Sequence, residues 1–188
     1  MDTRWRAMFS LTVQSCFVVA ALWLFSPMTV RADDLVAMQN DPGQWVHPGK
    51  NYSLTRYSEL DQIDTKNVKN LKVSWTFSTG VLRGHEGSPL VVGDTMYFVT
   101  PFPNIVYALD LTKPGADVKW KYEPKQDSAV IPVACCDVVN RGVAYADGKI
   151  FFNQLDAATV ALDAKTGRSC GKSSRVISSK GRRSPWHR

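Results

Sequence analysis

The sequence predicts an all-β fold, and three observations carry this prediction. Short apolar runs, many with β-branched residues, lie between residues 72 and 162 and are separated by Gly, Pro and Asp. Two pairs of runs are joined by the dipeptides Gly93-Asp94 and Asp147-Gly148, a spacing typical of β-hairpins. The segment 88–120 also resembles 142–167, with an offset of 54 residues that falls to 53. A four-stranded unit repeating every 40–55 residues or so is the signature of a β-propeller blade.

The chain begins with the layout of a secretory signal peptide, which we place at residues 1–32. Arg4 and Arg6 precede the apolar run 16–25, and Val30-Arg31-Ala32 forms a small-x-small pattern before Asp33. The run is about ten residues long, whereas a membrane span needs roughly 20. An uncleaved N-terminal anchor is the alternative. Export predicts an oxidising compartment, in which disulfides persist.

Next along the chain, residues 58–71 are a helical candidate: Ser58 could cap a short helical turn, and Asn67–Leu71 could make another. The strands follow, and Asp110 and Asp163 are expected to cap tight turns. Trp75 and Trp120 are interpreted as residues that dock one blade against the next. The expected strands are 72–78, 89–92, 95–100, 105–109, 118–122, 143–146, 149–153 and 159–162, with a loop at 123–137.

The composition changes abruptly after Gly167. Residues 168–188 hold seven Lys or Arg and no acidic residue, so we expect a disordered basic tail. One interpretation is a tail that contacts nucleic acid or anionic lipid. The other is a shift of reading frame, because one choice of codons read one base back restores a Trp at Cys170 or Gly171. That Trp would complete the second repeat.

The positive charge belongs to the two ends of the chain. The formal net charge is +6, but residues 33–167 alone carry −3. A nucleic-acid partner, which a basic surface would attract, is therefore not expected for the central part.

Five stretches then carry a resemblance to a known family. They are WVHPGKNYSLTRYSELDQI (45–63), SWTFSTG (74–80), LRGHEGSPLVV (82–92), ACCDVVNRG (134–142) and ALDAKTG (161–167). On these stretches, residues 41–167 resemble the N-terminal part of methanol dehydrogenases that depend on pyrroloquinoline quinone (PQQ), within the quinoprotein alcohol dehydrogenases. The 82–86 run and the 144–148 hairpin are more similar to the lanthanide type than to the calcium type.

The resemblance implies an eight-bladed propeller, of which 33–167 supplies the first blades. It implies PQQ on the central axis, on a calcium or lanthanide ion, between a tryptophan floor and a roof formed by a vicinal disulfide. It also implies a periplasmic enzyme, a homodimer in the parent, that oxidises primary alcohols to aldehydes and passes electrons to a c-type cytochrome.

Four residues are the candidate site. The adjacent Cys135 and Cys136 are, from the residues alone, either two reduced thiols, two halves of distant bridges or a strained vicinal disulfide; the resemblance implies the vicinal disulfide. Glu86, otherwise a solvated loop carboxylate, is implied to hydrogen-bond PQQ. Arg141, otherwise a surface cation or a partner of Asp137, is implied to bind the PQQ carboxylates, which suit a guanidinium.

The family's catalytic aspartate, metal ligands and floor tryptophan have no counterpart here, so we expect the chain alone to be inactive. The three histidines are not expected to form a metal site, and His47 is interpreted as structural. Two alternatives remain: a non-catalytic propeller of the outer-membrane assembly type and a quinoprotein sugar dehydrogenase. Glu86 and the cysteine pair argue against both.

Overall fold

The computed structural model describes residues 32–174, without the side chains of 32–34, Cys135 and Cys136. The predicted signal peptide up to residue 31, and the tail beyond residue 174, lie outside the described residues. Every element described below belongs to one compact unit of the chain. Within the described part, no helix has the length and apolar character needed to cross a membrane.

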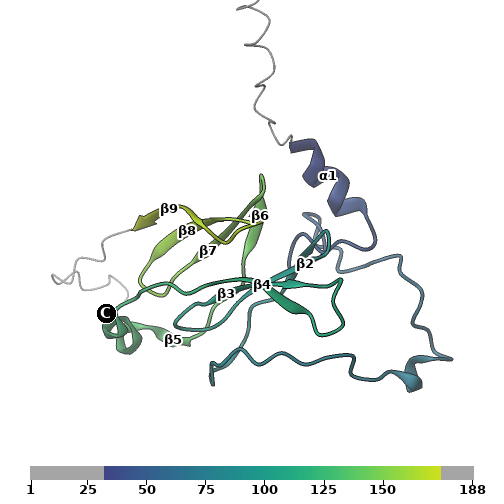
Figure 1. The fold of residues 1–188 in the computed structure, drawn as a ribbon, viewed down its shortest axis with the longest axis horizontal. Coiled ribbons are helices and arrows are strands. Elements are labelled where there is room, and N and C mark those ends of the chain that lie inside the picture. Colours follow the sequence, from purple (N-terminus) through teal and green to yellow (C-terminus); the bar gives the residue numbers. More distant parts are fainter. Residues whose placement is uncertain (1–31, 175–188) are drawn as a thin grey trace, which may run out of the picture. The chain divides into compact units, whose positions relative to one another are not determined.

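Two antiparallel four-stranded sheets follow one another along the chain (Figure 1). In each sheet the strands pair in sequence order, as in a meander. The first sheet contains β1 (Leu90–Val92), β2 (Thr95–Val99), β3 (Val106–Asp110) and β4 (Asp117–Tyr122). The second contains β6 (Ala144–Ala146), β7 (Lys149–Asn153), β8 (Ala158–Asp163) and β9 (Ser169–Ser174). The other elements are α1 (Ala32–Asn40), the 3-10 turns η2 (Val68–Asn70) and η3 (Ser128–Val133), and β5 (Cys135–Val138).

The two predicted hairpins and the internal repeat are confirmed. Asp147 and Gly148 both have positive φ, 48° and 68°, as the turn of a tight hairpin requires. Each third strand carries an irregularity against its fourth strand at the same point of the repeat, Ala108/Leu109 and Ala161/Leu162. The two sheets are thus two copies of one unit, and the all-β, propeller-blade prediction holds.

The two sheets share one apolar core. Burial alternates along β2 and β7, so one side of each strand faces this core. Facing side chains from two sheets exclude water from each other, which is the main favourable term in their association. The buried residues of this core are Val46, Leu90, Val92, Tyr97, Val99, Val106, Ala108, Trp120, Val143, Ile150, Phe152, Val160, Leu162 and Ala164.

Trp120 of β4 joins the first sheet to the second. Its indole Nε1 donates to the carbonyl oxygen of Ala164 at 2.9 Å, and Tyr97 Oη donates to the same oxygen at 3.1 Å. The ring lies against Gly167, where an added Cβ would come within 2.7 Å of two indole carbons. The predicted docking role of Trp120 is confirmed.

Residues 72–78 do not form the expected strand. No strand of the described part pairs with them, so their alternation serves packing rather than a hydrogen-bonded ladder. Trp75 and Phe77 pack on the other face of the first sheet, with the rings of Phe77 and Tyr107 5.1 Å apart. Trp75 therefore packs against the first sheet without belonging to a strand, and its expected role of docking one blade against the next stays a prediction.

Of the two helical turns expected in 58–71, the one at Asn67–Leu71 is confirmed as η2 (Val68–Asn70), and the one at Ser58 does not form. Ser58 caps no helix; its hydroxyl donates to the carbonyl oxygen of Pro42 at 2.7 Å. Leu60 and Ile63 are 55% and 60% exposed, so the apolar spacing finds no surface to bury against. Conversely, α1 was not expected, and η3 and β5 lie in the segment expected to be a loop.

The disorder expected from residue 168 is wrong for Ser169–Ser174. This segment pairs with β8 as strand β9, although all six residues are exposed. A strand at a sheet edge needs only its main-chain groups to pair, so its polar composition did not exclude it. Gly171 lies opposite Ala161, the place at which Trp120 lies opposite Ala108 in the first sheet.

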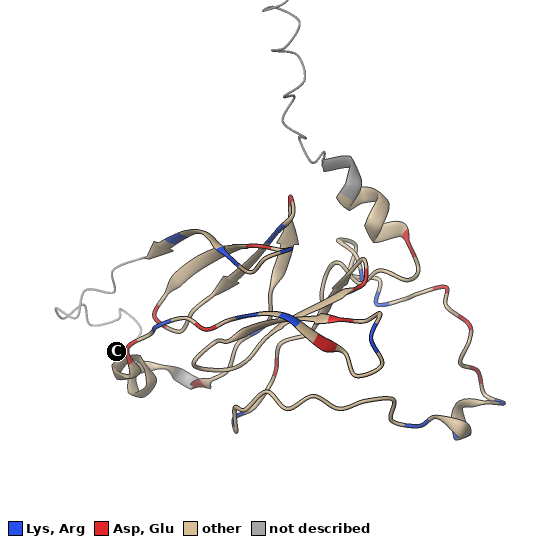
Figure 2. Ribbon diagram, in the orientation of Figure 1, with Lys and Arg blue, Asp and Glu red and all other residues tan. Residues whose placement is uncertain are grey.

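Charges of both signs are interspersed over the two sheets (Figure 2). On the edge strand β4, Lys119 Nζ lies 3.7 Å from Asp110 Oδ1, and Lys121 Nζ lies 2.7 Å from Glu123 Oε2. Charged side chains on an edge strand hinder pairing with other chains.

Asp110 and Asp163 hold the turns after β3 and β8, as predicted. Asp163 Oδ1 accepts from the amide and the hydroxyl of Thr166, each at 2.8 Å. These hydrogen bonds favour the ionised form, so the pKa of Asp163 lies below its ordinary value of 3.8. Asp110 has a lowered pKa for the same reason, through Thr112.

The lowered pKa of Asp163 predicts a defined acid sensitivity. A carboxylate whose pKa is depressed by folding stabilises the fold above the unfolded pKa, and this contribution is lost as pH falls through the folded pKa. In Asp163→Asn, the unfolding temperature is expected to fall less steeply than in the wild type below about pH 4. Melting curves by circular dichroism at half-unit pH steps measure this; equal slopes in both proteins would contradict it.

Candidate functional site

The structure brings Glu86 and Arg141 together, although they precede different repeats. Arg141 Nη1 is 2.6 Å from Glu86 Oε2. Glu86 precedes β1 and Arg141 precedes β6, the first strands of the two sheets, and a parallel bridge between Ser88 and Gly142 joins the two approaches. The side chains of Glu86 and Arg141 are 46% and 79% exposed, so both charges remain accessible to a ligand.

The backbone sets this pairing through two glycines. A Cβ added at Gly87 would lie 3.0 Å from both Cα and N of Gly142 and 3.2 Å from the carbonyl oxygen of Asn140. Gly142 has a φ of +120°, a backbone conformation that residues with a side chain rarely adopt. The two loops therefore approach each other more closely than a residue with a side chain at position 87 would allow.

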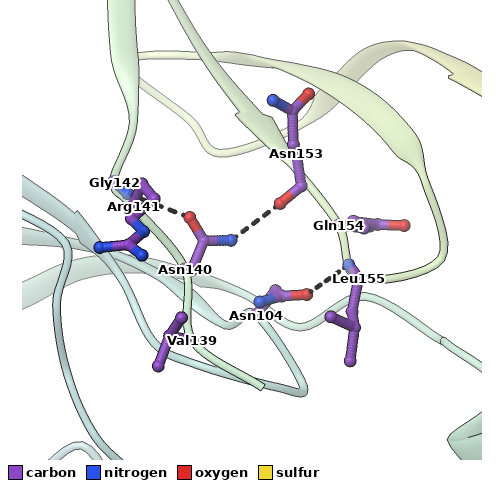
Figure 3. Close-up of a pocket in the computed structure, with 8 residues that line it drawn as sticks. All are labelled: Asn104, Val139, Asn140, Arg141, Gly142, Asn153, Gln154 and Leu155. Carbon is purple, nitrogen blue, oxygen red and sulfur yellow. Dashed lines mark hydrogen bonds between the residues drawn. The ribbon is translucent and has the colours of Figure 1, made fainter. Parts of the chain in front are cut away.

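Beside Arg141 lies a polar pocket of about 270 Å³ (Figure 3). Its amide side chains come from both sheets. Asn104 is buried, and its Oδ1 accepts from the amide of Leu155 at 3.0 Å. Gln154 is also buried, and no hydrogen bond within the described residues reaches the nitrogen or the oxygen of its side-chain amide. The lining residues are Asn104, Val139, Asn140, Arg141, Gly142, Asn153, Gln154 and Leu155.

The cysteine pair begins strand β5, but its side chains lie outside the described residues, so the disulfide stays a prediction. Asp137, which follows directly, has φ +65°, a strained value for a residue with a side chain. Its carboxylate is 3.8 Å from Arg83 Nη1 rather than paired with Arg141. Cys170 is exposed and free.

The described histidines, His47 and His85, do not form a cluster. His47 Nδ1 accepts from the amide of Gly49 at 3.1 Å, and its ring lies 5.6 Å from that of Tyr52, as a structural residue would. His85 contacts Thr79 Oγ1 at 3.1 Å. Among the residues that the structure describes, no group of three or more His, Cys, Asp or Glu could hold a metal ion.

Sequence reasoning missed the residues that hold the site. Asn140, Gly87 and Gly142 bind no expected ligand, yet they fix the loops that carry Glu86 and Arg141. The available signal was local: an Asn two residues before a Gly is typical of a turn closed by the Asn side chain.

Two successive meander sheets with a shared core, a docking Trp and a charged pair at the start of their first strands define consecutive blades of a β-propeller. The chain belongs to the PQQ family described as "Glucose/ethanol/alcohol dehydrogenase, beta-propeller domain", whose model matches residues 45–175. The resemblance found in the sequence is thereby confirmed.

Individual relatives agree with this family. A "Lanthanide-dependent methanol dehydrogenase" of Methylacidiphilum fumariolicum (strain SolV) is 57% identical over 149 residues, which are 79% of this chain and 24% of the relative. The "Methanol dehydrogenase [cytochrome c] subunit 1" of Paracoccus denitrificans is 52% identical over 143 residues, 73% of this chain and 22% of the relative. The solved structure of a "Europium-containing methanol dehydrogenase" has a TM-score of 0.74 at 58% identity, covering 76% of this chain and 25% of that one. The chain therefore spans about a quarter of the length of these relatives.

Proposed function

We propose that this chain supplies the first blades of a periplasmic, PQQ-dependent alcohol dehydrogenase. The parent enzyme would oxidise primary alcohols such as methanol to aldehydes and pass electrons to a c-type cytochrome. The observation that carries the proposal is the Glu86–Arg141 pair, which two neighbouring blades hold at the start of their first strands. The identity to methanol dehydrogenases supports the same assignment.

The exposed ends of this pair fit the proposed cofactor. PQQ is a planar quinone with three carboxylates, and a guanidinium binds a carboxylate with two parallel hydrogen bonds. Arg141 would hold a carboxylate, and Glu86 would hydrogen-bond the edge of the ring system. When bound, PQQ supplies the redox chemistry, and residues of this chain bind and orient it.

We further propose that Cys135 and Cys136 form a vicinal disulfide over the quinone. Alkylation of the unreduced protein followed by mass spectrometry of the peptide tests this. Unmodified cysteines with a mass two hydrogens lower are expected, and two alkylated thiols would contradict the disulfide.

The metal, calcium or a lanthanide, is a different case. The described residues provide no set of hard oxygen ligands for it. We place its ligands, with the catalytic aspartate, in other blades of the parent, so no catalytic step is assigned to this chain.

Arg141→Met tests the cofactor assignment. Because hydrogen bonds to charged groups contribute about 1.5–3 kcal/mol, loss of the guanidinium is expected to weaken PQQ binding by roughly tenfold or more. Equilibrium dialysis of PQQ against the chain measures the affinity. Arg168→Met is the control, because Arg168 lies between β8 and β9, at the far end of the sheet from Arg141. This variant is expected to bind PQQ as the wild type does. Equal loss in both variants, or none, would contradict the assignment, and a propeller scaffold would not bind PQQ at all.

A change of reading frame after Gly167 remains our proposal for the tail. The register supports it, since Gly171 holds the place of Trp120 and the corrected frame puts a Trp at or next to this residue. The nucleotide sequence after codon 167 tests it: codons that cannot encode a blade strand in the other frame would refute it.

A further inference from the structure

We propose that Asn140 is a positioning residue that fixes the direction of Arg141. This inference rests on the proposed function, because it concerns how the cofactor-binding guanidinium is held. The Arg141 side chain is 79% exposed, and an ion pair at such an exposed surface adds little stability. The pair with Glu86 is therefore too weak to fix the guanidinium, and its direction depends on the backbone beneath it.

Asn140 clamps that backbone with both ends of its amide. Its Oδ1 accepts from the amide of Gly142 at 3.1 Å, which closes a turn around Arg141. Its Nδ2 donates to the carbonyl oxygen of Asn153 at 2.8 Å, which ties the turn to the end of β7. Both partners are main-chain groups of fixed polarity, so the orientation of the amide is also fixed. Figure 3 shows the two bonds leaving Asn140 while the Arg141 side chain extends away from them.

Neither aspartate nor alanine reproduces both contacts. Aspartate keeps the acceptor for Gly142 but places a second oxygen against the carbonyl of Asn153. Alanine loses both bonds and leaves the turn with the Ser88–Gly142 bridge and the exposed Glu86–Arg141 ion pair. A guanidinium on a fixed turn loses less conformational entropy when it binds a carboxylate, so the clamp raises affinity without contacting the ligand.

The first test needs no ligand. NMR relaxation of the Arg141 backbone N–H group in the 188-residue chain reports the order of the turn that carries the guanidinium. In Asn140→Ala, the order parameter is expected to fall to about 0.6 or below, the range of flexible groups. Asn140→Asp is expected to lie between alanine and the wild type. Asn153→Ala is the matched control, because it keeps the Asn153 carbonyl and removes only a side chain that contacts Thr159. An unchanged order parameter in Asn140→Ala would overturn the proposal.

The second test separates positioning from general stability. Asn140→Ala is expected to weaken PQQ binding five- to tenfold or so, the loss of about one hydrogen bond. In the Arg141→Met background, the same change is expected to alter the affinity less than twofold. Equal losses in both backgrounds would show a merely structural role and overturn the proposal. If the wild-type chain binds no PQQ while Arg141 still loses order in Asn140→Ala, the proposed function fails but the positioning role stands.

Discussion

Replacement of Trp120 by alanine is expected to lower the free energy of unfolding by about 3–5 kcal/mol. The ring is only 8% exposed and lies between the two sheets, in the core that both share. Alanine would leave a cavity between β4 and the turn at Gly167, because the ring fills the space above that glycine. Urea denaturation followed by circular dichroism, which does not depend on the removed fluorophore, measures the change.

Trp120→Phe separates packing from hydrogen bonding. Phenylalanine keeps an aromatic ring but cannot donate to the carbonyl of Ala164, which would still accept from Tyr97 Oη. A loss of about 1 kcal/mol from the missing hydrogen bond is expected, with a smaller term from the reduced ring. If Trp120→Ala costs less than about 1 kcal/mol, the two sheets do not depend on this contact and the docking role is refuted.

The sequence predicted those elements whose signal is local. The hairpin at Asp147-Gly148 needs two residues with positive φ, and the turn after β8 needs an Asp before Thr166, so both were found. The strand expected at 72–78 failed because a strand requires a partner, and alternation of apolar residues does not show whether one exists. Strand β9 was missed for the opposite reason, since its polar side chains give no strand signal although its backbone pairs with β8.

The candidate site divides in the same way. The resemblance to the PQQ enzymes identified Glu86 and Arg141, and the structure pairs them. Nothing in the local sequence shows that their loops meet, because the meeting depends on how two sheets pack. The supporting contacts of Asn140 and Gly87 are likewise tertiary, and only the structure places them.

Gly87→Ala is expected to separate these two loops and to cost about 1–3 kcal/mol of unfolding free energy. The new methyl group would meet the backbone of Gly142 at 3.0 Å, and backbone atoms cannot rotate aside as a side chain can. The loop of Arg141 must then move, so PQQ binding is also expected to weaken, on the cofactor assignment proposed above. Thermal or urea unfolding gives the first quantity and equilibrium dialysis of PQQ the second.

Gly84→Ala is the matched control in the same segment. Its added Cβ would lie 3.9 Å from Val139 Cγ1, an ordinary contact, so a change within about 0.5 kcal/mol and unchanged PQQ binding are expected. If Gly87→Ala behaves like Gly84→Ala, the close approach of the backbones does not hold the site together. If Gly87→Ala weakens PQQ binding while Arg141→Met does not, the close contact of the two backbones positions groups other than the guanidinium. If Gly87→Ala and Arg141→Met both weaken PQQ binding while Gly84→Ala does not, the backbone contact between the two loops positions the charged pair, and the ion pair itself does not.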